Sequence, residues 1–119
     1  MRDIPSLYAE LNRVFMPDEE WSLGESLDAL DDLLYGGFGV LAQASSARVV
    51  WVDSAVSREA LGIPLTRAYL AAKLERPDIY AAGPVRAALD DLERGGGTTY
   101  FELVLQVFAG HPELDLVLA

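Results

Sequence analysis

The stretch Arg48–Asp53, with the sequence RVVWVD, decides which fold class this chain can adopt. Four consecutive apolar residues, three of them valine, stand between polar turns and predict a β-strand. Because the run is apolar on both faces, we expect a central strand that is covered on both sides. A second apolar run, Leu114–Leu118, follows a Gly-His-Pro turn and predicts another strand.

Helical periodicity fills most of the chain outside these two strands. We expect helices at about 5–15, within 24–37, and at about 65–75, 84–94 and 99–109, with a helical turn near 57–61. The last helix is apolar nearly all round and should be central and buried. Residues 39–44 fit either a helical turn or a strand. Because helices separate the strands, we expect a parallel pair in a small α/β layered fold, with one domain over residues 1–119.

The composition favours cationic partners. The chain has 119 residues, 51% of them hydrophobic, a net charge of −10 and a single lysine. Such a surface repels nucleic acid and anionic membranes and attracts basic proteins. There is no cysteine, no signal-peptide core and no apolar run near the length of a membrane helix. We therefore expect a cytoplasmic protein with no nucleic-acid or membrane partner, monomeric when unbound.

Residue patterns typical of catalysis are missing. The single histidine, His111, lies in a Gly-His-Pro turn, which predicts a surface turn residue rather than a general base. The glycines of 95–97 lack the lysine and the spacing of a phosphate-binding loop, so they predict a turn between helices. No nucleophile elbow or zinc-binding pattern occurs. We expect a protein that is not an enzyme and that needs no cofactor or metal.

The segment Gly24–Gly37, GESLDALDDLLYGG, predicts a short amphipathic helix of about ten residues. Ser26 is the expected N-cap, and Gly36 or Gly37 supplies the C-terminal stop. One face of the helix is apolar, with Leu27, Leu30 and Leu34 at helical spacing. The opposite face is acidic and carries Glu25, Asp28 and Asp32, with Asp31 beside them.

The acids of this helix do little for the stability of the helix itself. Asp28 and Asp32 form a like-charged i, i+4 pair, and the helix dipole opposes a negative charge in the second half. No cation follows either residue at i+3 or i+4. In the helix near 84–94, by contrast, Asp90 should pair with Arg86 and Arg94.

Several interpretations of the acidic helix are open from these residues alone. It can be an ordinary solvated face, or an anionic patch preorganised for a basic partner. Asp28 with Asp32 can also be an acid pair or a divalent-metal site. A hard cation needs several further oxygen ligands, however, and the sequence offers only Asp31 or Glu25 nearby. The flanking aromatic residues can pack at the helix ends or act as interface hot spots. These aromatic residues are Trp21, Tyr35 and Phe38.

A family resemblance rests on the same segment. Gly24–Leu33, GESLDALDDL, closely resembles the Gly-Glu-Asn-Leu-Asp-Ala-Leu-Trp-Asp segment of the barstar family, whose members are intracellular inhibitors of ribonucleases. Phe101–Phe108 is similar to the last helix of that family, and Leu114–Leu118 to its closing strand. The resemblance implies a barstar-like layered fold, with about residues 61–97 as an inserted helical segment.

The resemblance also implies a mode of action and a set of contact residues. Family members plug the cationic, RNA-binding site of a nuclease with the acidic helix and the loop before it. By position, Asp28 and Asp32 match the two family aspartates that enter the nuclease site, and Gly36 matches an interface glycine. Tyr35 takes the place of a family threonine, and Asp31 that of a tryptophan.

The chain departs from the family pattern at other contact positions. The family's loop tyrosine falls at Ser22, with Trp21 beside it as a substitute. A family tryptophan falls at Gly37, and a glutamate of the last helix falls at Gly110. The first family strand has no counterpart in the sequence.

Two functions follow as expectations. The first is a ribonuclease inhibitor of the kind that is usefully encoded beside its toxin, with a binding site made of Asp28, Asp32, Asp31, Tyr35, Gly36, Trp21, Ser22 and Gly24. The alternative is a non-inhibitory interaction or regulatory module on the same fold that binds another basic partner through the inserted helices.

Overall fold

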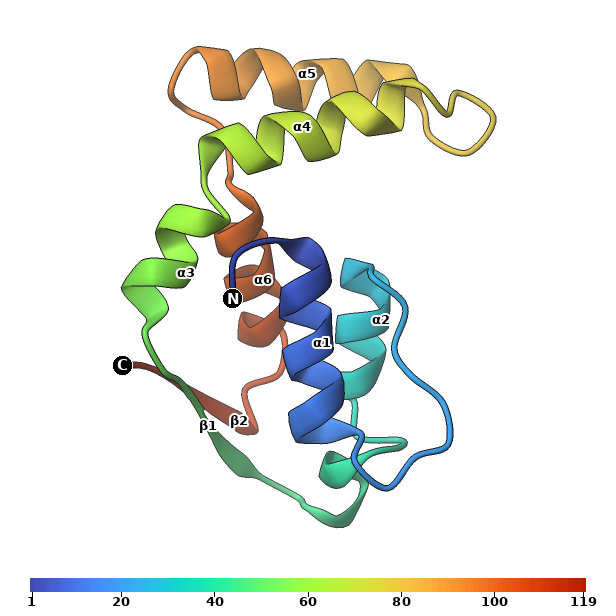
Figure 1. The fold of residues 1–119 in the computed structure, drawn as a ribbon, viewed down its shortest axis with the longest axis vertical. Helices are drawn as coiled ribbons and strands as arrows, with labels where there is room; N and C mark the ends of the chain where they lie inside the picture. Colours follow the sequence, from blue (N-terminus) through green and yellow to red (C-terminus); the bar gives the residue numbers. More distant parts are fainter.

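The computed structural model describes residues 1–119 and contains six α-helices, one 3-10 helix and two β-strands (Figure 1). In chain order these are α1 (Ile4–Phe15), α2 (Leu27–Leu34), η1 (Val40–Gln43), β1 (Ala47–Trp51), α3 (Ser54–Ala60), α4 (Ile63–Leu74), α5 (Ala82–Glu93), α6 (Tyr100–Ala109) and β2 (Leu114–Leu118). The expected helices and strands are confirmed. Residues 39–44, which left two options open, form the 3-10 helix η1.

The two strands form a parallel sheet, as the sequence predicts, in a register that runs from Ala47 opposite Leu114 to Trp51 opposite Leu118. The expectation that β1 is central and covered on both sides is wrong. Two strands give β1 only one neighbour, and on the outer face Val50 and Val52 are 51% and 68% exposed. With no helix over that face, the outer valines stay in solvent.

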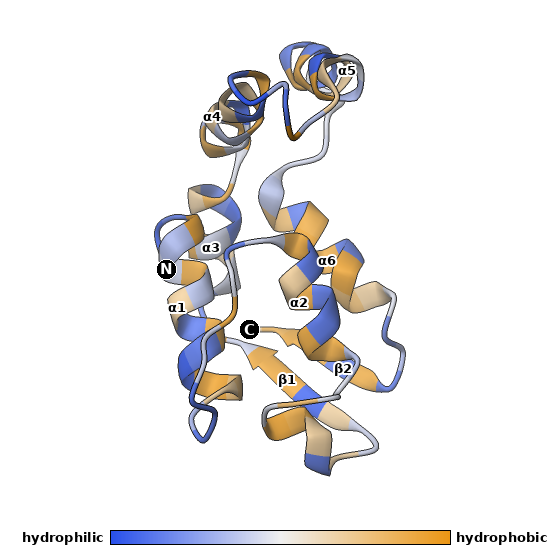
Figure 2. Ribbon diagram, turned by 90° about the vertical axis from the view of Figure 1, so that its right-hand side faces the viewer, coloured by the Kyte–Doolittle hydropathy of each residue, from blue (hydrophilic) through white to orange (hydrophobic).

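The hydrophobic core lies on the inner face of the sheet, around α6. Thr99 caps α6 through a capping box with Glu102, so the helix begins at Tyr100. Phe101, in the first turn of α6, stacks on Trp51 of β1 with ring centroids 4.9 Å apart. The strands and most of α6 are orange in Figure 2, which marks the hydrophobic residues. Four residues of α6, Tyr100, Phe101, Val104 and Phe108, are buried in this core, and the others are half-buried or exposed. The last helix is therefore central, as predicted, but it is only partly buried.

A buried pair of tyrosines ties α1 to α6. The hydroxyls of Tyr8 and Tyr100 lie 2.9 Å apart, and both side chains are almost fully buried. The backbone N–H of Tyr100 donates to the Thr66 hydroxyl of α4 at 2.8 Å. Burial raises the pKa of Tyr8 and of Tyr100, because a phenolate loses more hydration than a neutral phenol.

Helices α4 and α5 form a hairpin that projects from the rest of the molecule, with the first half of α4 packed on the main core (Figure 1). The hairpin has a small core of its own, made of Leu70, Val85 and Leu92. The ion pairs predicted within α5 between Asp90 and its two arginines are absent. Instead, Glu93 accepts a hydrogen bond from Arg67 of α4 at 2.6 Å, because the paired helices bring these side chains together.

No helix of the structure combines the length and the apolar character that a membrane crossing requires.

Raising the pH should unfold this protein through the two buried tyrosines. Burial keeps both phenols protonated in the folded state, whereas a tyrosine in the unfolded chain loses its proton at about pH 10. The two phenols should therefore leave the free energy of unfolding unchanged between about pH 8 and about pH 10, and above that they should lower it by up to about 1.4 kcal/mol per pH unit for each phenol. Urea unfolding between about pH 8 and about pH 11 measures this slope.

The variant Tyr8→Phe tests the same pair at neutral pH. It leaves the Tyr100 hydroxyl without its partner, which should cost about 1–3 kcal/mol, and it should flatten the alkaline slope. Tyr80→Phe is the matched control, since Tyr80 lies exposed after α4. A slope that is equal in all three proteins would contradict the assignment.

Candidate functional site

The acidic helix α2 is fixed at both ends by local interactions. The Ser26 hydroxyl accepts a hydrogen bond from the backbone N–H of Ala29 at 3.1 Å, so the predicted N-cap is confirmed. After Tyr35, Gly36 adopts a φ of 81°, a conformation that glycine tolerates and that ends the helix. The helix has eight residues rather than about ten. Three leucines, Leu30, Leu33 and Leu34, are fully buried and hold it against the core.

Two carboxylates on α2 have no partner in the structure. Asp28 and Asp32 are exposed, and neither takes part in any ion pair or side-chain hydrogen bond. Asp28 lies in the first turn, and the last turn carries no basic residue. Asp28, Asp32 and Tyr35 follow at i, i+4 and i+7, so they share one face of the helix. The Tyr35 side chain is 74% exposed on that face.

The histidine of the Gly-His-Pro turn is buried, and its prediction as a surface residue is wrong. His111 is only 3% exposed. Its Nε2 lies 2.6 Å from Oδ1 of Asp31, and its ring forms a T-shaped pair with the ring of Tyr35, with centroids 4.7 Å apart. Its Nδ1 faces Glu113 at 3.5 Å. The imidazole therefore lies between this turn and α2.

This contact gives Asp31 a different role from its two acidic neighbours. The His111 backbone donates to the Phe108 carbonyl at 2.9 Å and accepts from the Leu114 N–H at 3.0 Å. The imidazole therefore anchors α2 to the connection between α6 and β2. Asp31 uses one carboxylate oxygen in this anchor, and its side chain stays 44% exposed. The sequence offered no signal for this pair, because 80 residues separate its members.

The loop before α2 is held in place by side chains of its surroundings. The Leu23 N–H donates to the Asn12 side chain of α1 at 2.7 Å. Trp21 packs on Phe38 with ring centroids 4.7 Å apart, yet its side chain stays exposed. The packing interpretation is therefore confirmed for Trp21, and its role as an interface residue stays a prediction. The Glu19 carboxylate accepts the Gly39 N–H at 2.9 Å and closes the arrangement.

The other site residues predicted from the sequence fall on the same segment. Ser22 and Gly24 are exposed in the loop before α2, and Gly36 is half-buried after it. A Cβ added at Gly36 would lie 3.2 Å from the Leu41 carbonyl oxygen, so the close approach and the positive φ both require glycine. No hydrogen bond or ion pair links Trp21 or Ser22 to the acids of α2.

The chemistry available to this surface is that of unpaired carboxylates. No group of three or more histidine, aspartate or glutamate side chains lies close enough to hold a metal ion. Asp28 and Asp32 can accept hydrogen bonds from lysine, arginine or histidine of another molecule. The fold and the site thus define a small α/β protein that presents a fixed acidic helix.

Comparison of the chain with models of protein families, with curated proteins and with solved structures gives no match. The resemblance to the barstar family therefore stays a prediction drawn from the residues of α2, α6 and β2.

Breaking the bond between His111 and Asp31 should affect stability more than removing an unpaired acid of α2. His111→Ala removes a buried ring and its bond to Asp31, which should lower the free energy of unfolding by about 2–3 kcal/mol. Asp28→Asn removes an unpaired charge that is repelled by Asp32, so it should change stability by less than about 0.5 kcal/mol. Urea unfolding at neutral pH measures both values.

A double-mutant cycle between His111→Ala and Asp31→Asn tests whether the two side chains act together. Coupled residues should give a non-additive term of about 0.5 kcal/mol or more. Strict additivity would show that the Asp31 and His111 side chains contribute no interaction energy to stability. It would contradict the anchoring role of Asp31.

Proposed function

We propose that this protein inhibits a ribonuclease by inserting the acidic face of α2 into the cationic active site of the enzyme. The observation that carries the proposal is the pair Asp28 and Asp32, two exposed carboxylates without cations on a helix that is capped and packed into the core. The resemblance of Gly24–Leu33 to the barstar family supports the same assignment.

The physical basis is mimicry of the charge of the substrate. A ribonuclease holds phosphates with arginine, lysine and histidine side chains, and carboxylates can accept the same charge-assisted hydrogen bonds. Asp28 and Asp32 lie one helical turn apart on a rigid backbone, so binding orders few additional groups. The net charge of −10 also attracts a basic enzyme from a distance.

The aromatic residues supply contact area around these charges. Tyr35 shares the face of Asp28 and Asp32, and Trp21 stays exposed in the loop before the helix. Tyrosine and tryptophan are enriched among the residues that dominate interface energies. Asp31 holds this surface in place, because its hydrogen bond to His111 fixes the orientation of α2 relative to the turn after α6.

Removing either unpaired carboxylate should weaken inhibition strongly. We expect Asp28→Ala and Asp32→Ala each to raise the inhibition constant by about 30-fold or more, the loss of about 2 kcal/mol that marks an interface hot spot. The measurement is RNA cleavage by a small basic ribonuclease, taken first from the gene that neighbours the one for this chain.

Asp90→Ala is the matched control for these variants. It removes the same charge from an exposed position of α5 and so changes long-range attraction equally. Inhibition close to that of the original protein by both α2 variants would overturn the assignment of the site. Equally weakened inhibition in all three variants would show that α2 contributes only its share of the net charge and no specific contacts.

Association with the nuclease should be fast and sensitive to salt. Raising the ionic strength from about 0.01 M to about 1 M shortens the Debye length from about 30 Å to about 3 Å, which screens the attraction between the acidic chain and a basic enzyme. Stopped-flow measurements should show a falling association rate constant with a smaller change in dissociation. A rate constant independent of salt would contradict electrostatic capture.

A second candidate keeps the fold but assigns binding to the hairpin of α4 and α5. The observation that favours it is the projection of this hairpin from the rest of the molecule, with Ile79 and Tyr80 exposed near its tip (Figure 1). The module would then bind another basic partner. Binding that survives Asp28→Ala and Asp32→Ala but fails after Ile79→Ser and Tyr80→Ser would favour it.

A further inference from the structure

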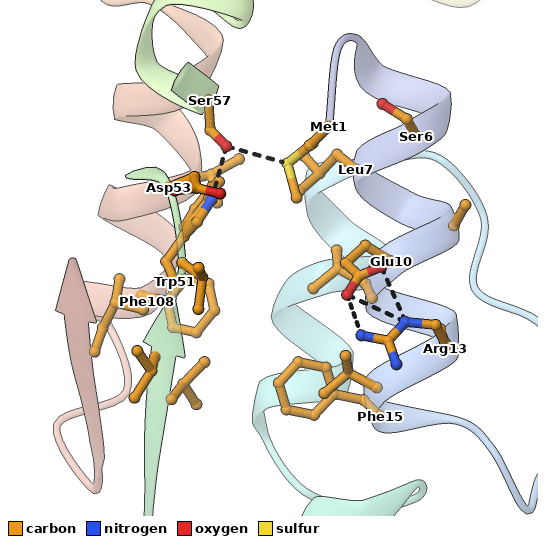
Figure 3. Close-up of a pocket in the computed structure, with 18 of the residues that line it drawn as sticks. Met1, Ser6, Leu7, Glu10, Arg13, Phe15, Trp51, Asp53, Ser57 and Phe108 are labelled. Carbon is orange, nitrogen blue, oxygen red and sulfur yellow. Dashed lines mark hydrogen bonds and ion pairs between the residues drawn. The ribbon is translucent and has the colours of Figure 1, made fainter. Parts of the chain in front are cut away.

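An apolar cleft of about 690 Å³ separates α1 from β1 (Figure 3). Fourteen of the 19 residues that line it are hydrophobic, among them Leu7 and Phe15 of α1 and Trp51 of β1. At one end the Ser57 hydroxyl lies 3.7 Å from the sulfur of Met1 and bridges the two walls. The cleft runs along the side of β1 that faces away from β2, so the core is open beside the sheet.

The free edge of β1 borders this cleft. The Ala47 N–H donates to Glu113, and the Trp51 carbonyl accepts from Ala119. Because backbone groups alternate along a parallel strand, the residues that bond to β2 are Ala47, Val49 and Trp51. The N–H and C=O groups of the residues between them, Arg48 and Val50, therefore point away from β2. They form an unpaired strand edge.

Of the two regular structures that a partner can offer, a helix and a strand, only a strand pairs with this edge and fills the cleft beside it. A helix makes its backbone hydrogen bonds internally and leaves the edge groups of β1 unpaired. An extended strand can pair with Val50 and its neighbours and can point every second side chain into the cleft. The remaining side chains of that strand would join the exposed outer face of the sheet, next to Val50 and Val52.

The charges around the cleft favour a basic strand. Two of the lining residues, Glu10 and Arg13, neutralise each other through their ion pair on α1. Asp53 lines the cleft at the end of β1, and its carboxylate makes no ion pair (Figure 3). Its φ of 55° fixes the backbone at that point. Of the lining side chains, only Asp53 keeps an unpaired charge, and that charge is negative, on a chain with a net charge of −10.

We propose that this cleft binds an extended segment of a partner polypeptide, which adds a third strand to the sheet at the free edge of β1. The segment has apolar side chains at alternate positions and a basic residue opposite Asp53. β1 has five residues, so a partner segment of about five to seven residues covers its length. A second copy of this chain is disfavoured as the occupant, because each copy carries ten net negative charges.

Two synthetic peptides test this proposal with the full chain. Both alternate valine and threonine over six residues, and each carries one lysine, either at the amino end or at the carboxyl end. Calorimetry measures binding, and amide hydrogen exchange reports on the Val50 N–H. A parallel strand places the carboxyl-end lysine at Asp53, and an antiparallel strand places the amino-end lysine there. Because the edge of β1 accepts one direction, we expect one of the two peptides to bind at least fivefold more tightly. The Val50 amide should exchange at least tenfold more slowly in that complex.

Two controls separate strand pairing from adhesion to an apolar surface. The first is the tighter peptide with methylated backbone nitrogens at alternate positions, made in both alternations. Only one of the two alternations methylates the N–H groups that face β1. That peptide keeps its side chains but lacks the donors, so it should lose at least tenfold in affinity. This control uses the original protein, so it does not depend on the folding of any variant. The second replaces the lysine with glutamate, which should also weaken binding at least tenfold.

Variants of the chain locate the edge. Val50→Pro removes one N–H from the free edge without touching the ladder to β2, and it should weaken binding at least tenfold. Leu118→Pro is the matched control on the opposite edge of the sheet and should leave binding unchanged. Asp53→Asn tolerates the left-handed backbone and should remove the preference between the two lysine peptides.

Three outcomes would overturn the proposal. The first is equal binding of both methylated peptides and the original one. The second is equal binding of the lysine and glutamate peptides. The third is sedimentation of the free protein as a dimer with the Val50 amide already protected, which would make a second copy the occupant.

Discussion

Burial of α6 is the constraint on which the rest of the structure depends. This helix is apolar on most of its surface, so it must be covered on several sides at once, and a sheet of two strands covers only one of them. Helix α2 covers another side with its leucines, and Tyr8 of α1 reaches the first residue of α6 through a buried hydrogen bond. The position of α2 is therefore a consequence of core packing. Its acidic face points outward because the opposite, apolar face is buried against the core.

The same packing explains why the acids of one short helix differ in role. Asp31 lies beside the turn that leads from α6 to β2, where His111 is buried, and the two side chains bond. Asp28 and Asp32 lie on the exposed face that also carries Tyr35, so the structure offers them no cation. Two charges that the fold leaves unpaired are thus held by a helix that the fold anchors firmly. This combination of rigidity and unsatisfied charge makes α2 the strongest candidate for binding a basic protein.

Local signals predicted most of the elements but not their surroundings. The cap at Ser26, the valines of β1 and the glycine at position 36 act within a few residues, so the sequence reveals them. His111 and Asp31 are distant in the chain, and only the docking of α2 on α6 brings them together. The ion pair between Arg67 and Glu93 likewise depends on how α4 meets α5, and it replaces the pairs expected within α5.

The sequence by itself determined the α/β class, the parallel pairing of the strands and the acidic face of α2, because periodicity and caps are properties of neighbouring residues. Tertiary structure alone decided that β1 is an edge strand beside an open apolar cleft, that His111 is buried, and that Asp31 is bonded while Asp28 and Asp32 are not. The physical reason is that burial and pairing depend on which surfaces meet in space. An apolar run has the same sequence whether or not a neighbour covers it.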